Sequence, residues 1–404
     1  MVVRTGRSAN ETERVRRASF DSLHDRDGRG LDVLVVGAGV IGLACAWRAA
    51  QRGFSVAVID RDAPGSGASG IAAGMLAPIG EASWGEQALL DLNLASAQLF
   101  PDFVAELEQA SGRSVGYRRC GALHVALDRD EAAELRRRHE LQESLGLDAE
   151  WLSARECREL EPGLATAVTG GIHARDDAEV DPRSLVAALL AALERQGVQV
   201  TAPCEAVEAI VDAGRLAGVR TSAGELRAQH TVLASGWRSG QAEWLPPDAR
   251  PPVRPVKGQI VSLRGPADEP LCRRIVATEW VYVVPRADGR VVVGATVEER
   301  GADVTVTAGG VHELLREAYR VLPDVAELEL TGVAAGLRPG SPDNAPLIGE
   351  GALDGLILAT GHYRNGVLLA PVTAEAVAAL IAGEQPPEAA ARLGAVRFAE
   401  AGSR

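Results

Sequence analysis

Three glycines and one aspartate have the residue types and spacing that bind a dinucleotide. Gly37, Gly39 and Gly42 form the pattern G-x-G-x-x-G directly after an apolar run and at the start of an apolar-rich segment. In this pattern the first glycine permits a tight turn, the second lets the backbone approach a pyrophosphate, and the third packs a helix on a strand. Asp60 closes a second apolar run about 20 residues on, where an acid accepts hydrogen bonds from ribose hydroxyls. We therefore predict a dinucleotide site at a helix N-terminus, whose free N–H groups and dipole favour phosphate.

Two other segments have the composition of a binding surface for an extended ligand with a flat ring. Residues 65–76 read GSGASGIAAGML, which is small or apolar apart from the serines. Such a segment lets the chain lie along the ligand and exposes N–H groups to it; the alternative is a flexible Gly/Ser loop. Residues 360–368, TGHYRNGVL, follow an apolar strand-like run and precede a helix-like one. They place backbone donors at a second helix N-terminus, beneath the ring end of a long cofactor.

The elements that must position these residues are strands and helices in alternation. Leu31–Val36 is a continuous β-branched run, as expected for a strand buried on both faces. A helix over Leu43–Gln51, ending near Gly53, and a strand over Ser55–Ile59 complete one βαβ unit. This unit is typical of a Rossmann-like dinucleotide-binding domain.

A second αβ unit begins at Asp181, which is placed to cap a helix with Pro182 in its first turn. Leu185, Leu189 and Leu193 line one face of that helix, and Gly197 ends it before a strand that starts at 198–200. Further predicted elements are strands at 230–234 and 356–359 and a helix at 373–382.

The pattern of apolar and polar residues changes between these units. Segments near 117–127 and 253–298 either alternate between apolar and polar residues or consist of runs of β-branched residues, with charged turns between them. This pattern predicts antiparallel strands. The fold class is therefore α/β (α+β overall), a Rossmann-like domain interrupted by pieces of one antiparallel, β-rich domain.

Composition limits the classes of partner and compartment. The chain has 404 residues, which favours two domains that share one ligand. The net charge of −13 disfavours nucleic acid and anionic membrane, and no apolar run reaches the roughly 20 residues of a membrane span. Residues 1–30 are polar and lack the apolar core of a secretory signal, so we expect a disordered extension.

Five scattered cysteines form no C-x-x-C pair, and the histidines are equally dispersed: Cys45, Cys120, Cys157, Cys204 and Cys272. This pattern argues against a disulfide framework and against a metal site, and it favours a reducing, cytoplasmic location.

Several motifs together resemble the D-amino-acid oxidase superfamily of FAD-dependent oxidoreductases, and within it the glycine oxidases of thiamine biosynthesis. They span about residues 31–383: GAGVIG (37–42), Asp60, GIAAGML (70–76), VYVVPR (281–286), VVVGAT (291–296), GLRPGSPDNAPLIG (336–349) and TGHYRNGVLLAP (360–371). The resemblance implies an FAD-binding domain formed by residues 31–113, 178–250 and 337–387. It implies a substrate domain formed by residues 114–177 and 251–336, with a tail at 388–404 and often a homotetramer.

The resemblance also implies site residues. Those that carry over as FAD contacts, beside Gly37, Gly39 and Gly42, are Val40, Ile41, Asp60, Arg61, Ala68, Ser69, Ala73, Gly74, Met75, Val207, His362, Tyr363, Arg364, Asn365, Gly366, Val367 and Leu368. Asp60 stands where most such flavoproteins have Glu. The 336–349 stretch lacks the cysteine to which covalent sarcosine oxidases attach flavin, so the FAD is expected to be non-covalent.

The family's carboxylate-binding arginine falls on Arg338 and its substrate-site tyrosine on Tyr282. A planar guanidinium binds a carboxylate bidentately, which fixes the α-carbon against a flavin. A surface arginine and a packed core tyrosine remain the structural alternatives. Arg364 is a candidate for substrate binding, flavin positioning or structure, and Lys257 for a charge near the flavin or for the scaffold.

The resemblance implies oxidation of glycine, sarcosine or a small D-amino acid to an imine, with dioxygen reduced to hydrogen peroxide. The imine hydrolyses to glyoxylate and ammonia or passes to thiazole synthesis, which makes the thiazole synthase a candidate partner. Because hydride leaves directly for the flavin, no catalytic side chain is expected. Two alternatives stay open, a D-amino-acid or sarcosine dehydrogenase that reduces a quinone and a non-catalytic flavin-binding sensor.

Overall fold

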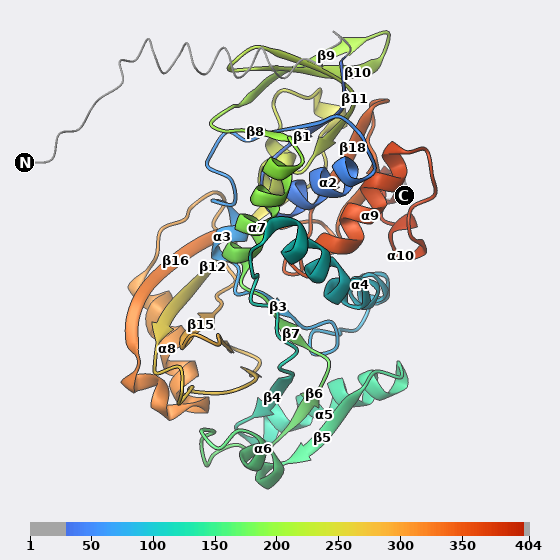
Figure 1. Cartoon of the computed structure of the whole chain (residues 1–404). Helices are drawn as coiled ribbons and strands as arrows, with labels where there is room; N and C mark the ends of the chain where they lie inside the picture. The colour runs from blue at the N-terminus through green and yellow to red at the C-terminus, as the bar shows by residue number, and fades with distance from the viewer. Residues whose placement is uncertain (1–29, 400–404) are drawn as a thin grey trace, which may run out of the picture.

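The computed structural model describes residues 30–399, so the predicted extension, apart from its last residue, lies outside the described residues. Two eight-stranded sheets and a two-stranded ribbon make up the described β structure. In Figure 1 the first sheet and its helices form the upper part of the molecule and the second sheet the lower part, with the ribbon between them.

The first sheet has the strand order β17-β18-β11-β1-β2-β8, and β9 and β10 continue from β11. Its strands are β1 (Leu31–Val36), β2 (Val56–Ile59), β8 (Gln199–Thr201), β9 (Ala206–Asp212), β10 (Arg215–Thr221), β11 (Glu225–Leu233), β17 (Leu347–Glu350) and β18 (Leu356–Thr360). Neighbouring strands from β18 to β8 are parallel, which brings their carboxyl ends to one edge.

Helices cover one face of this sheet, and a loop containing Trp244 and Val253 covers the other. The helices are α2 (Val40–Gln51), α4 (Gln87–Ser111), α7 (Pro182–Arg195) and α9 (Ala370–Ile381). As predicted, the Asp181 carboxylate caps α7 by accepting hydrogen bonds from the backbone N–H groups of Arg183 (2.9 Å) and Ser184 (3.3 Å). The predicted apolar face of α7 is fully buried against α2 and the sheet.

The second sheet has the order β16-β12-β15-β14-β13-β4-β6-β5. Its strands are β4 (Ala122–Ala126), β5 (Ala149–Ser153), β6 (Gly170–Ala174), β12 (Arg254–Arg264), β13 (Ile275–Ala277), β14 (Tyr282–Pro285), β15 (Arg290–Gly294) and β16 (Glu329–Gly340). All neighbours are antiparallel except the β4–β13 pair. The helices around it are α5 (Arg129–Ser144), α6 (Ala154–Leu160) and α8 (Ala308–Val321).

The ribbon of β3 (Met75–Leu76) and β7 (Ala178–Glu179) is tied to the second sheet by a buried ion-pair cluster. Glu179 is 1% exposed and pairs with Arg286 (2.8 Å) and Arg118 (2.7 Å). Arg286 also donates to the backbone carbonyl of Ala73. Because a buried carboxylate is costly without partners, this cluster fixes the ribbon, and with it residues 73–75, against the second sheet.

The remaining described elements are short: α3 (Ala68–Ile71), η1 (Gly236–Gln241), η2 (Pro247–Ala249), η3 (Pro323–Glu327), α10 (Glu388–Ala391) and α11 (Val396–Ala399). The predicted fold class and elements are confirmed, with shifts of a few residues at some ends. Apart from the short elements named above, four described helices have no counterpart among the predicted elements: α4, which contains Pro101, α5, α6 and α8. The residue ranges assigned to the two domains stay predictions.

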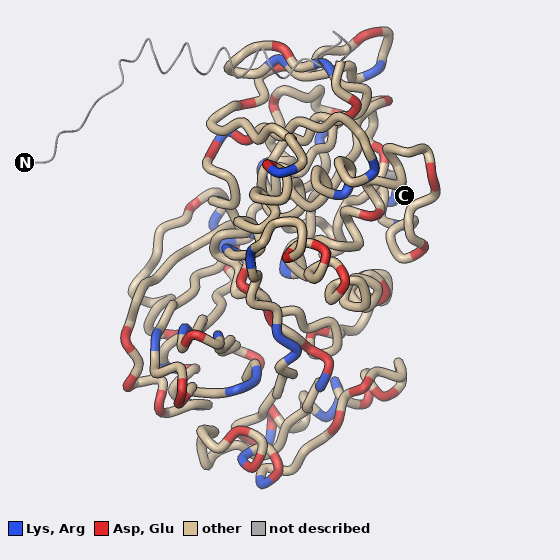
Figure 2. The backbone as a smooth tube through the Cα atoms, in the orientation of Figure 1, with Lys and Arg blue, Asp and Glu red and all other residues tan. Residues whose placement is uncertain are grey.

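Acidic and basic residues are mixed along both parts of the molecule (Figure 2). None of the helices within residues 30–399 combines the length and the apolar character that crossing a membrane requires.

Candidate active site

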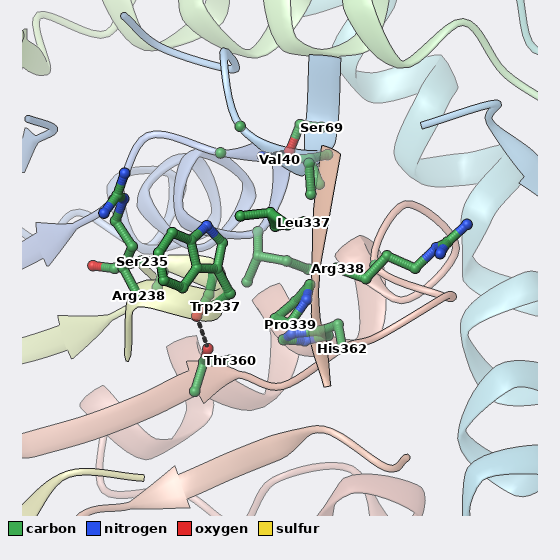
Figure 3. Close-up of a pocket in the computed structure, with 18 of the residues that line it drawn as sticks. Val40, Ser69, Ser235, Trp237, Arg238, Leu337, Arg338, Pro339, Thr360 and His362 are labelled. Carbon is green, nitrogen blue, oxygen red and sulfur yellow. Dashed lines mark hydrogen bonds between the residues drawn. The ribbon is translucent and has the colours of Figure 1, made fainter. Parts of the chain in front are cut away.

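A cavity of about 730 Å³ extends from the carboxyl ends of β1 and β2 to the second sheet. This volume falls in the range of roughly 300–1,000 Å³ that is typical of ligand sites. Figure 3 shows Val40 and Ser69 beside β16 near the start of α2, with Trp237 and Arg338 on opposite sides of that strand. Both sheets therefore contribute side chains to one continuous site.

The glycine motif lies where α2 begins. Gly37 and Gly39 line the cavity, and the backbone N–H of Val40 donates to the Ser69 hydroxyl (3.0 Å). Gly42 does not line it, because it faces the loop: a Cβ there would lie 1.9 Å from the carbonyl oxygen of Gly37. The third glycine is therefore required for the helix to pack against the loop, as its predicted role states, and the first two leave the helix N-terminus open to an anion.

Asp60 joins the end of β2 to the glycine loop. Its carboxylate accepts hydrogen bonds from the backbone N–H groups of Ala38 (2.7 Å) and Asp62 (2.9 Å). Desolvation raises the pKa of Asp60, and the two backbone hydrogen bonds oppose that rise. Each carboxylate oxygen retains lone-pair capacity toward the cavity, which suits the two hydroxyls of a ribose.

The loop between β18 and α9 forms the opposite wall. His362 is 2% exposed, and its Nε2 lies 3.0 Å from the Thr373 hydroxyl. Burial lowers the pKa of His362 to about 3, so its imidazole is neutral at physiological pH. Tyr363 has φ 44° and donates its backbone N–H to the Pro339 carbonyl (2.9 Å), which ties this loop to β16.

Arg338 and Tyr282 meet at the part of the cavity formed by the second sheet. Nη1 of Arg338 donates to the backbone carbonyls of Thr296 (3.0 Å) and Lys257 (3.4 Å). The guanidinium lies on Gly258, where a Cβ would be 2.5 Å from both of its terminal nitrogens. Burial raises the pKa of Tyr282, and the Arg338 charge opposes that rise. Because only Nη1 of Arg338 is engaged by backbone carbonyls, other N–H groups remain to bind a carboxylate.

Arg364 and Lys257 have different surroundings from Arg338. Arg364 lines the rim of the cavity, lies 3.7 Å from Glu86 and stacks on the Tyr363 ring. Lys257 is 1% exposed, lies outside the lining and pairs with Asp303 (3.0 Å) and Glu298 (3.6 Å). These contacts favour the scaffold interpretation of Lys257.

The structure brings nearly all of the predicted site residues together in the cavity lining. Those in it are Gly37, Gly39, Val40, Ile41, Asp60, Arg61, Ala68, Ser69, Ala73, Gly74, Met75, Val207, Tyr282, Arg338, His362, Tyr363, Arg364, Asn365, Gly366 and Val367. Gly42 and Leu368 lie outside it. Leu368 is buried in the core among the helices, and its carbonyl accepts the Ser96 hydroxyl (2.6 Å).

Several lining residues were not predicted. Trp237 and Arg238 follow β11, and the Arg238 guanidinium stacks on the Trp237 ring at 4.5 Å. Their position at the carboxyl end of a parallel strand was a usable signal. Glu81 and Gly258 also line the cavity, but neither stands in a local pattern that marks it. Within residues 30–399, no group of three or more His, Cys, Asp or Glu side chains is arranged to hold a metal ion.

Comparisons with known proteins agree with this geometry. Residues 32–380 match the family described as DAO, FAD dependent oxidoreductase. The chain is 37% identical over 354 residues to the bifunctional protein ThiO/ThiG of Trichormus variabilis, covering 87% of this chain and 52% of the relative. It thus spans about half the length of the first curated relatives that it matches.

Two further relatives match over nearly their whole length. The chain is 36% identical to the glycine oxidase of Geobacillus kaustophilus, covering 87% of this chain and 92% of the relative. The crystal structure of glycine oxidase from Bacillus cereus superposes with a TM-score of 0.82 at 31% identity, covering 88% of this chain and 96% of that one. The dinucleotide motif, the two-sheet fold and these matches lead to one conclusion: the chain belongs to the family of FAD-dependent oxidoreductases typified by D-amino-acid oxidase.

Proposed function

We propose that this chain is a glycine oxidase that holds FAD non-covalently. The observation that carries the proposal is Arg338, whose guanidinium shares one cavity with the glycine motif and Asp60. A carboxylate anchor at the far end of a dinucleotide site is the arrangement that an amino-acid oxidase requires. The relatives named glycine oxidase support the choice of substrate.

The lining residues fit FAD. The N-terminus of α2 and Asp60 suit a pyrophosphate and a ribose, and residues 362–367 with 73–75 suit a flat ring. Within the described residues, Cys204 is the one cysteine of the lining, and its N–H donates to the carbonyl of Asp60 at the ribose end. A cysteine at that end is poorly placed to attach a flavin ring, which supports non-covalent binding.

When bound, FAD supplies the acceptor for the hydride that leaves the α-carbon. The residues of this chain then bind and orient the substrate. Arg338 binds the carboxylate, and Tyr282 places its phenol beside that carboxylate. The neutral imidazole of His362 forms an uncharged part of the cavity lining. The overall reaction converts glycine, dioxygen and water into glyoxylate, ammonia and hydrogen peroxide.

The biological role that we propose is supply of glycine imine for the thiazole of thiamine. The match to bifunctional ThiO/ThiG proteins supports this role and a thiazole synthase as partner. A homotetramer and a cytoplasmic location remain parts of the same proposal.

The test is a steady-state assay of the purified protein with glycine, sarcosine and small D-amino acids. We expect glycine-dependent consumption of dioxygen with stoichiometric hydrogen peroxide. Turnover that requires an added quinone would instead establish the dehydrogenase alternative. A flavin-bound protein that turns over none of these amines with either acceptor would establish the sensor.

A further inference from the structure

Glu81 is an acid in the part of the cavity that we assign to the substrate. It lies between β3 and α4 and lines the same cavity as Arg338 and Tyr282. Within residues 30–399, no hydrogen bond or ion pair joins its carboxylate to another side chain. An unpaired carboxylate beside a carboxylate-binding arginine is suited to the other end of an amino acid, the amine.

The backbone before this acid is held by buried side chains. The Asp177 carboxylate accepts the backbone N–H groups of Ile79 (3.3 Å) and Gly80 (3.2 Å). Gln142 donates to the Ile79 carbonyl (2.9 Å), and Arg138 donates to the Gly80 carbonyl (3.3 Å). Asp177 and Gln142 are both fully buried. Because all four backbone polar groups are engaged, the segment presents its next side chain from a fixed position.

Charged and titratable groups surround the carboxylate on several sides. Those that interact with it electrostatically are Arg138, Arg338, Arg364, Glu86, Asp177 and Tyr282. Burial raises the pKa of Glu81, and the charges of Arg364 and Arg338 oppose that rise. A carboxyl whose pKa is raised toward the working pH is a better proton acceptor than an ordinary one.

We propose that Glu81 binds the ammonium group of the incoming amino acid and accepts its proton. This inference rests on the proposed function, because an amino acid must reach the cavity as a zwitterion and react as a neutral amine. Arg338 and Glu81 then recognise the two charged ends of one small molecule. Asp177, Arg138 and Gln142 are positioning residues that act through the backbone of the segment.

One N–H bond of the ammonium breaks, an O–H bond forms on Glu81, and the electron pair stays on nitrogen. That lone pair then becomes the second bond of the C=N group as the α-carbon gives up its hydride. To form hydrogen peroxide, dioxygen needs one proton together with the hydride equivalent, and Glu81 donates that proton.

The experiment compares Glu81→Gln with wild type across pH, with FAD occupancy checked in both. For Glu81→Gln we expect kcat/KM for glycine at pH 7 to fall about 10²-fold, the scale of a lost proton acceptor. The acidic limb of the kcat/KM profile should also move to higher pH, toward the pKa of the free amine. Acetate lacks an amine, so its dissociation constant, measured from the flavin absorbance, should change less than about threefold.

The matched control is Glu86→Gln, which removes one negative charge from the same segment without lining the cavity. We expect its acidic limb not to move to higher pH, because loss of the Glu86 charge can only lower the pKa of Glu81. Glu81→Asp keeps a carboxylate, so its acidic limb should stay at the wild-type pH although its kcat/KM is lower. This variant preserves the test if Glu81→Gln loses flavin. An unmoved limb in Glu81→Gln, or an equal shift in Glu86→Gln, would overturn the inference. A wild type inactive on glycine would instead overturn the proposed function.

Discussion

At the scale of the residue, the site is defined by how each polar side chain is satisfied. Asp60 and Arg338 each use part of their hydrogen-bonding capacity on the backbone and keep the rest for a ligand. His362, in contrast, is buried beside the Thr373 hydroxyl and holds no charge. The cavity thus combines two charged side chains that are only partly satisfied by the backbone with one buried, neutral imidazole.

Replacing Arg338 with leucine is expected to lower kcat/KM for glycine by roughly 10²–10³-fold while FAD stays bound. The physical reason is that a substrate carboxylate left without its partner in a dry site costs on the order of 3–5 kcal/mol. Steady-state kinetics on glycine and on a simple primary amine measure this loss in kcat/KM. The amine lacks a carboxylate, so equal losses on both substrates would assign Arg338 a structural role.

Replacing His362 with glutamine is expected to make stability less sensitive to acid. The pKa of His362 is about 3 in the folded protein against roughly 6.5 in the unfolded chain, so acid favours unfolding between these values. Between pH 7 and pH 5, wild type should lose about 1–2 kcal/mol more of its free energy of unfolding than the variant does. Urea titrations at the two pH values measure the difference, with the exposed His312→Gln as control. Parallel losses in wild type and His362→Gln would contradict the neutral imidazole.

At the scale of the element, the sequence predicted those helices and strands that are determined by residues close together in the chain. The strand β1 and the capped helix α7 follow from β-branched runs, an aspartate cap and a proline in the first turn. Glu81 and Gly258 did not follow, because both reach the cavity through contacts with segments distant in the chain. Glu81 is placed by Asp177, almost one hundred residues away, and no spacing rule covers such a distance.

Replacing Gly42 with alanine is expected to disturb the packing of α2 against the glycine loop. The added methyl group would lie 1.9 Å from the Gly37 carbonyl oxygen, so α2 must move away from the loop. We expect a loss of about 1–3 kcal/mol in the free energy of unfolding and at least tenfold weaker FAD binding. Gly309→Ala in α8 is the matched control, since its methyl group meets nothing within 4 Å. Unchanged FAD affinity in Gly42→Ala would show that the start of α2 tolerates the shift.

At the scale of the whole molecule, the cavity takes its walls from both sheets. The first sheet contributes the motif around Gly37 and the loop at His362, and the second contributes Tyr282 and Arg338. A ligand in this cavity therefore touches both parts of the fold, so its binding free energy adds to the stability of their arrangement.

We expect the purified protein to be yellow and to release its flavin into the supernatant on acid precipitation. Among residues 30–399 the one cysteine of the lining, Cys204, lies beside Asp60, at the end that we assign to the ribose. Absorbance of pellet and supernatant at the flavin bands measures the partition. Flavin retained by the denatured pellet would disprove non-covalent binding.

The strand β16 connects the second sheet to the loop at His362. It pairs with β12 in the second sheet and carries Arg338, and two residues later it bridges to His362 through Gly340. The Pro339 carbonyl also accepts the backbone N–H of Tyr363. The arginine that we assign to the substrate carboxylate and the loop that we assign to the flavin ring are thus joined through one strand. A shift of one sheet relative to the other would therefore move Arg338 and the loop at His362 together, because the same strand holds both.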